Sequence, residues 1–111
     1  MKNLISIYDL SQISDFLPQI SPAMYLLNVF MQMCDDVNAI KVGKLELASA
    51  LNRSRRTVSE WIRMLCKSGA IKYKYSGLVR LNPFLYYKGT AENYKKAKEE
   101  WAQFKSDIKA I

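Results

Sequence analysis

The chain has 111 residues, of which half are hydrophobic and about a quarter are charged, so we expect a packed core and no wholesale disorder, in one domain or in one domain with a docking or dimerisation helix. There is no histidine, and the only two cysteines, Cys34 and Cys66, lie in apolar helical patterns, so we expect structural thiols and neither a disulfide framework nor a metal site. The formal net charge of +7 is concentrated in residues 41–80, which hold ten Lys or Arg against two Glu. Such a block predicts a polyanionic partner, with a merely solvated basic face as the alternative.

No stretch is apolar for long enough to cross a bilayer, since the longest run, residues 23–33, is interrupted by Asn28 and Gln32. Lys2 is followed by acidic residues and not by a signal-peptide core. We therefore expect a cytoplasmic protein with no membrane contact.

The first predicted elements are an N-terminal extension, residues 1–20, with a short helix around residues 10–17, and then a long helix. Ser21 followed by Pro22 predicts the start of that helix, which runs to about Asp35. One of its faces is apolar and consists of Ala23, Leu26, Leu27, Phe30, Met33 and Cys34. Residues 39–42 form a short β-branched piece after it.

Residues 44–69 have the spacing of a helix-turn-helix. Leu47, Ala48 and Leu51 form the inner face of a first short helix, and Asn52-Arg53 makes the turn. Ser54 is a strong N-cap for a second helix that ends before Gly69. In the second helix Val58, Ile62 and Leu65 recur on one face, so they are expected to pack against the first.

The opposite face of the second helix carries the candidate recognition residues: Arg55, Arg56, Ser59, Glu60 and Arg63. In helix-turn-helix proteins this helix enters the major groove, where Arg suits guanine and a carboxylate can accept from cytosine. Lys44, Arg53 and Ser54 are the candidate contacts to the DNA backbone. The alternative is a charged helix in a helical bundle.

Residues 70–82 alternate in polarity on both sides of a turn and predict a β-hairpin, the wing. A three-residue turn, residues 75–77, pairs Tyr73 with Val79 and Lys72 with Arg80, whereas a two-residue turn would mix charged and apolar side chains on both faces. The predicted wing contacts to DNA are Lys72, Lys74, Tyr75 and Arg80. Lys72, Lys74 and Arg80 would share one exposed face. The alternative interpretation is an ordinary solvated hairpin face that binds no DNA.

Asn82-Pro83 ends the hairpin, and a short turn over residues 84–88 stops at Gly89. Thr90 then caps a helix of about twenty residues, within the segment 90–111. Its apolar stripe contains Tyr94, Trp101, Phe104 and Ile108, which we expect to mediate dimerisation or, alternatively, to dock on the same chain.

Several of these motifs together resemble plasmid replication proteins of the RepL type. They are Glu46-Leu-Ala48, Thr57-Val58, Gly69-Ala-Ile71, Leu81-Asn82-Pro83 and Lys88-Gly89, over residues 22–104. The resemblance implies a winged helix followed by a charged C-terminal helix and a role in replication.

The sequence thus predicts a mainly α fold with a small β-hairpin, a winged helix-turn-helix with an N-terminal extension and a long C-terminal helix. The domains would be residues 1–20, 21–89 and 90–111. We expect a sequence-selective double-stranded DNA-binding homodimer in plasmid, phage or mobile-element replication or copy control. A transcriptional repressor and a protein-interaction module are the alternatives. No catalytic constellation, cofactor or small-molecule ligand is expected.

Overall fold

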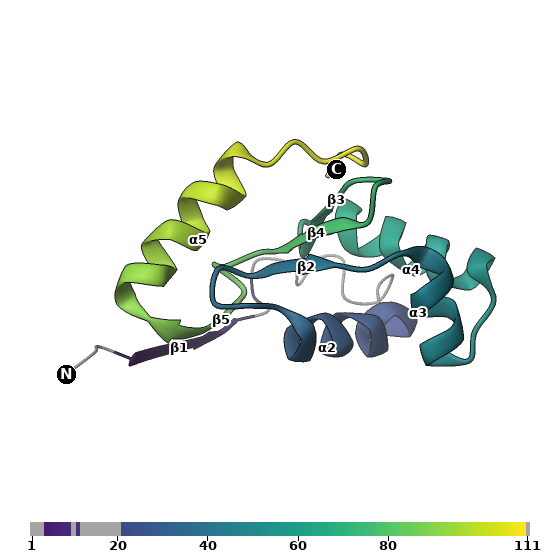
Figure 1. Cartoon of the computed structure of the whole chain (residues 1–111), viewed down its shortest axis with the longest axis horizontal. Coiled ribbons are helices and arrows are strands. Elements are labelled where there is room, and N and C mark those ends of the chain that lie inside the picture. Colours follow the sequence, from purple (N-terminus) through teal and green to yellow (C-terminus); the bar gives the residue numbers. More distant parts are fainter. Residues whose placement is uncertain (1–3, 10, 12–20, 111) are drawn as a thin grey trace.

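The computed structural model of the chain describes residues 4–9, 11 and 21–110. Within these ranges the chain forms four α-helices, one 3-10 helix and five strands in two antiparallel sheets (Figure 1). In chain order they are β1 (Leu4–Tyr8), η2 (Ser21–Ala23), α2 (Met24–Met33), β2 (Ala39–Lys41), α3 (Lys44–Leu51), α4 (Arg55–Lys67), β3 (Ile71–Tyr73), β4 (Leu78–Leu81), β5 (Tyr86–Thr90) and α5 (Ala91–Gln103). No helix among them is long and apolar enough to cross a membrane.

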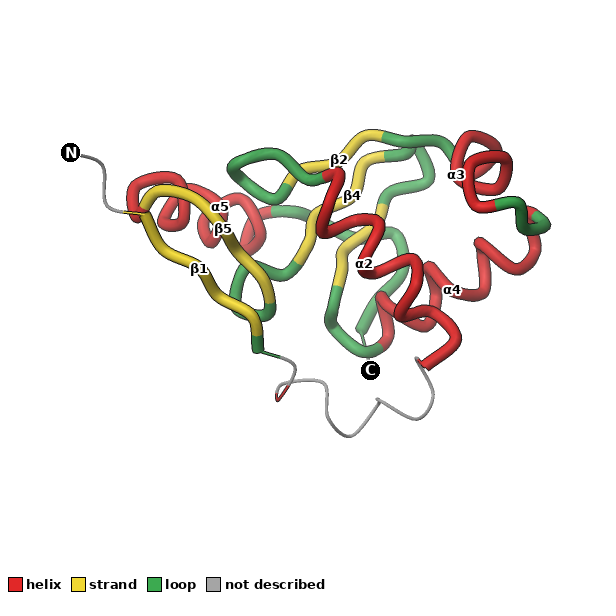
Figure 2. Tube along the Cα trace, turned by 90° about the horizontal axis from the view of Figure 1, so that it is seen from below, coloured by secondary structure: helices red, strands yellow, loops and turns green. Residues whose placement is uncertain are grey.

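The expectation of a mainly α fold with a small β-hairpin is wrong, because the described chain is an α+β domain. β2 joins the hairpin strands in a sheet of order β2-β4-β3, and β1 pairs with β5 in a second sheet. Leu4 lies opposite Thr90 and Tyr8 opposite Tyr86, so this second sheet joins the N-terminal strand to the segment that leads into α5 (Figure 2). Neither strand was predicted: residues 4–8 were assigned to an extension, and residues 84–88 to a turn.

The first long helix begins later than its sequence indicates. Ser21 and Pro22 belong to the 3-10 turn η2, and α2 has Ala23 at its N-cap, with no side-chain hydrogen bond there. The predicted apolar face is confirmed at Ala23, Leu26, Leu27 and Phe30, which are buried completely, and differs at its end, where Met31 is buried and Met33 is 44% exposed. The short helix expected around residues 10–17 lies largely outside the described residues.

The main core lies between α2, the α3–α4 pair and the three-stranded sheet. Each part contributes side chains with no exposed surface: α2 contributes Leu26 and Phe30, α4 contributes Ile62, and β4 contributes Val79. Asn38 connects this core to the second sheet, since its buried amide donates to the carbonyl oxygens of Leu81 and Tyr86. The two sheets are therefore joined by a buried polar side chain as well as by the chain itself.

Candidate nucleic-acid interface

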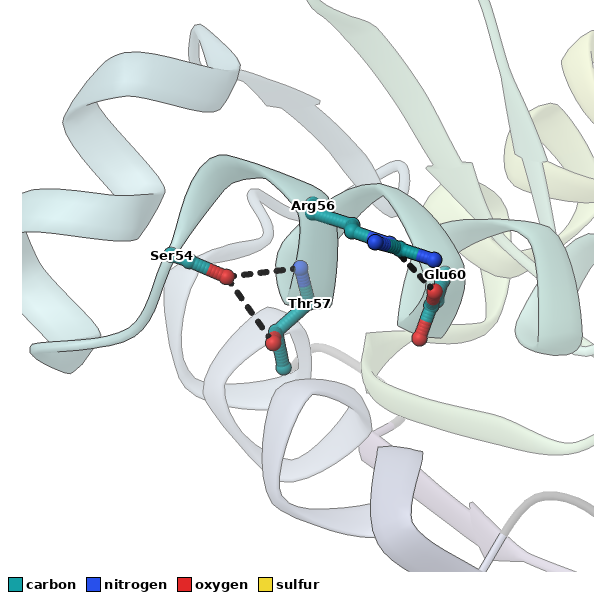
Figure 3. A network of polar contacts seen from close by, with 4 residues as sticks. All are labelled: Ser54, Arg56, Thr57 and Glu60. Carbon is teal, nitrogen blue, oxygen red and sulfur yellow. Dashed lines mark hydrogen bonds and ion pairs between the residues drawn. The ribbon is translucent and has the colours of Figure 1, made fainter.

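The pair α3–α4 has the local structure that its sequence predicts. Asn52 ends α3 in the left-handed conformation, with φ of 53° and ψ of 49°. The hydroxyl oxygen of Ser54 accepts a hydrogen bond from the amide of Thr57 at 3.1 Å and donates to the Thr57 hydroxyl at 3.0 Å (Figure 3). Val58, Ile62 and Leu65 are buried completely, so this face of α4 packs on the core and the opposite face, which carries Arg56 and Glu60, is directed away from it.

The outer face of α4 presents the predicted recognition residues. Arg55, Arg56, Glu60 and Arg63 are exposed, and Ser59 is half-buried. Arg56 and Glu60 form an ion pair of 3.3 Å one turn apart, with their side chains 89% and 54% exposed (Figure 3). An exposed pair of this kind contributes little to stability, so both side chains remain available to a ligand.

A groove lies beside this face and gathers basic residues from three parts of the chain. Its volume is about 470 Å³, and it is lined by Lys44, Ser59, Arg63, Lys67, Tyr75, Asp107, Ile108 and Lys109. Four of these side chains are cationic, and Asp107 is the one carboxylate among them. We call this feature the basic groove.

Lys44 and Tyr75 connect the basic groove to a second hollow. The ammonium nitrogen of Lys44 lies 5.4 Å from the ring centroid of Tyr75 and 5.5 Å from that of Tyr73. Both Lys44 and Tyr75 also line a hollow of about 350 Å³ that includes Arg55. Arg55 and Arg63 thus lie beside adjoining depressions, and the start of α3 and the hairpin tip border both of them.

The predicted hairpin register is confirmed. Ile71 pairs with Leu81, Lys72 with Arg80 and Tyr73 with Val79, and Gly77 has a φ of +96° at the end of the turn. The carbonyl oxygen of Gly77 accepts a hydrogen bond from the amide of Val42, so the turn packs on the end of β2. A Cβ added at Gly77 would lie 3.0 Å from the Val42 carbonyl oxygen, so a larger residue would not fit there without a shift.

The predicted exposure of this hairpin's basic face is wrong, because the C-terminal arm, residues 91–110, covers it. The ammonium group of Lys72 donates to the carbonyl oxygen of Trp101 at 2.6 Å and lies over the Trp101 ring. Lys74 and Arg80 lie over the Phe104 ring, at 4.9 and 5.2 Å from its centroid. Arg80 also pairs with Glu100 at 3.5 Å. Burial lowers the pKa of the Lys72 ammonium group.

The arm is helical only as far as Gln103, which corrects the expected helix of about twenty residues. Beyond Phe104 it runs along the free edge of β3. Asp107 donates its amide to the carbonyl oxygen of Tyr73 at 2.7 Å, and its carboxylate accepts from the amide of Tyr75 at 2.8 Å. The hydroxyl of Ser106 accepts from the amide of Tyr73. These bonds satisfy strand-edge groups that a continued helix would leave unpaired.

The apolar stripe of the arm makes its contacts within the same chain. Tyr94 packs on Tyr87, with ring centroids 5.0 Å apart, and Trp101 and Phe104 cover the hairpin cations. Ile108 packs against the main core. These contacts correspond to docking on the same chain, one of the two uses expected for this stripe.

Sequence reasoning missed two residues of the basic groove, Lys67 and Lys109. Lys67 was interpreted only as a favourable charge in the last turn of α4. Lys109 was assigned to a continuing helix, and only the return of the arm along β3 places it beside α4. Arg53, Ser54 and Arg56 lie outside the lining of the groove, at or near the exposed start of α4.

Both cysteines are free thiols. Burial raises the pKa of Cys66 to about 12 and also raises that of Cys34. Across the described ranges, no three His, Cys, Asp or Glu side chains gather in a way that could hold a metal ion.

Known protein families, curated proteins and solved structures yield no match to this chain.

Proposed function

We propose that this chain binds double-stranded DNA through the exposed face of α4 and the basic groove beside it. The observation that carries the proposal is the convergence of Arg55, Arg56 and Arg63 on one helix face next to a groove with four cationic side chains. A duplex offers a dense row of phosphates, and cations arranged along a rigid surface bind it by releasing its counterions. The apolar face of α4 is buried on the domain, which leaves the arginine face free to enter a major groove.

The position of each side chain suggests a division of roles. Arg55 and Arg56 occupy the first turn of α4, the part of such a helix that contacts base edges, and Glu60 lies one turn further on. Guanine presents two acceptors that match an Arg fork, and cytosine presents a donor that suits Glu60. Arg63 and the groove residues Lys44, Lys67 and Lys109 would hold backbone phosphates.

Control of replication or copy number of a plasmid, phage or mobile element is our proposal for the process. It is supported by the resemblance of Leu81-Asn82-Pro83 and Lys88-Gly89 to the RepL type. A transcriptional repressor would use the same surface at a promoter in place of an origin. Mapping the bound site to one or the other distinguishes the two roles.

The test compares two variants that each remove one positive charge. A preferred duplex is first selected from a random pool, and its affinity is then measured by fluorescence anisotropy at several salt concentrations. We expect Arg63→Ala to weaken binding about tenfold and to reduce the slope of log K against log salt by about 0.9, because one phosphate contact is lost. Lys95→Ala, on an exposed position of α5, should leave both nearly unchanged.

Equal effects of the two variants would show that only net charge matters and would reject the groove as the site. Absent or salt-insensitive DNA binding would favour a domain that contacts other proteins.

A further inference from the structure

A second cationic surface lies under the C-terminal arm. Lys72 and Arg80 are direct partners across β3 and β4, and the side chains of Lys74 and Arg80 lie over one ring, that of Phe104. Like charges placed opposite one another across two strands destabilise a hairpin. The three cations therefore need compensation from another group.

The arm compensates these charges poorly. Glu100, bonded to Arg80, is the one carboxylate that the described contacts place on them, and the arm carries five Lys against four Asp or Glu, so its side chains add a net positive charge. Two buried atoms of the pair have no hydrogen-bond partner, the Nε of Arg80 and one carboxylate oxygen of Glu100. The bonds of the Arg80 guanidinium, to Glu100 and to the Val79 carbonyl oxygen, are long, at 3.5 and 3.4 Å. A phosphate free to align with this guanidinium would accept two parallel bonds from its fork, whereas one carboxylate oxygen of Glu100 has no hydrogen-bond partner here.

The arm is also lightly attached. Of residues 91–110, only Ala97 is buried, and the arm segment along β3 is held by the half-buried Ile108 and by a few hydrogen bonds to Tyr73 and Tyr75. Segments with little buried apolar surface open at a low free-energy cost.

We propose that the hairpin face formed by Lys72, Lys74 and Arg80 is a second polyanion-binding surface, which the C-terminal arm covers and which a nucleic-acid backbone occupies when the arm moves away. The inference rests on the proposed function, because the same duplex would extend from the basic groove onto the hairpin. The arm and the phosphates compete for the same three cations, so the arm limits the affinity of the closed protein.

The experiment loosens the arm without changing any charge. The variant F104A/S106A removes the ring under Lys74 and Arg80 and the hydroxyl that accepts from the Tyr73 amide. Amide hydrogen exchange is expected to rise in residues 101–108 and to stay unchanged in α4. Ser106→Ala alone is the milder variant, which keeps the packing and should give a smaller change of the same sign.

We expect the loosened variant to bind the selected duplex about three to ten times more tightly. Its salt slope should be steeper by about one to two units, since up to three new phosphate contacts form on the hairpin while Lys109 leaves the basic groove with the arm. Lys74→Ala is then added to each protein. In the loosened variant it should reduce the slope by about 0.9, and in the otherwise unchanged chain it should have little effect.

The matched control is Lys96→Ala, an exposed lysine on α5, which should not alter the slope in either protein. An unchanged slope after loosening, or an equal effect of Lys74→Ala in both proteins, would overturn the inference while leaving the proposed function intact if Arg63→Ala still weakens binding. Loss of DNA binding in every protein would reject both.

Discussion

At the scale of single residues, burial strongly changes the acid–base chemistry of Cys66. Its side chain is 1% exposed on the inner side of α4, and burial raises its pKa from 9.0 to about 12. A thiol of this kind does not ionise near neutral pH, so it is a poor nucleophile while the domain is folded.

This pKa shift predicts how the stability depends on pH. The unfolded chain loses the Cys66 proton near pH 9, whereas the native chain keeps it up to about pH 12, so this contribution is complete below pH 9 and is lost as pH rises toward 12. Between pH 8 and 10.5 the free energy of unfolding should fall by about 2 kcal/mol more in the unchanged chain than in Cys66→Ala. Denaturant titration of both proteins at the two pH values measures the difference. Parallel losses would mean that the thiol ionises as easily when folded as when unfolded.

At the scale of elements, the start of α4 determines where the arginine face begins. Ser54 satisfies the otherwise free amide of Thr57 through its hydroxyl oxygen. We expect Ser54→Ala to reduce the free energy of unfolding by about 1 kcal/mol, because the cap is lost. Ser49→Ala, at an exposed position inside α3, is the matched control and should be neutral or slightly stabilising. If both variants have the same stability, the cap does not hold the end of α4.

Elements defined by local chemistry were predictable from the sequence. The bounds of α3 and α4 follow from Asn52 and Ser54, and the hairpin register follows from strict alternation around Gly77. In each case neighbouring residues contain the information.

Elements defined by distant partners were not predictable. Leu4–Tyr8 is a strand because it pairs with Tyr86–Thr90, about eighty residues away. Nothing in the sequence of either segment identifies the other as its partner. The end of α5 at Gln103 is another such case, since the apolar spacing continues through Phe104 and Ile108 while the chain turns to bond β3. The same turn brings Lys109 to the basic groove and covers Lys72, Lys74 and Arg80. The exposure expected for the candidate residues was therefore correct on α4 and wrong on the hairpin.

At the scale of the whole molecule, the positive block of residues 41–80 is divided between two surfaces. One is the open face of α4 with the basic groove, and the other is the hairpin face under the arm. The β1–β5 sheet lies at the opposite end of the molecule from α3 and α4 (Figure 1). Residues 4–8 of that sheet carry no charged side chain, and residues 86–90 carry only Lys88. A nucleic acid should therefore bind at the end formed by α3 and α4 and make no contact with the β1–β5 sheet.

Titration of the isotope-labelled protein with the selected duplex, followed by amide chemical shifts, tests this claim most directly. We predict salt-dependent shift changes in residues 55–63 and at Lys44, Lys67 and Lys109, with β1 and β5 unaffected. Shift changes concentrated in β1 and β5, or none at all at low salt, would contradict the account.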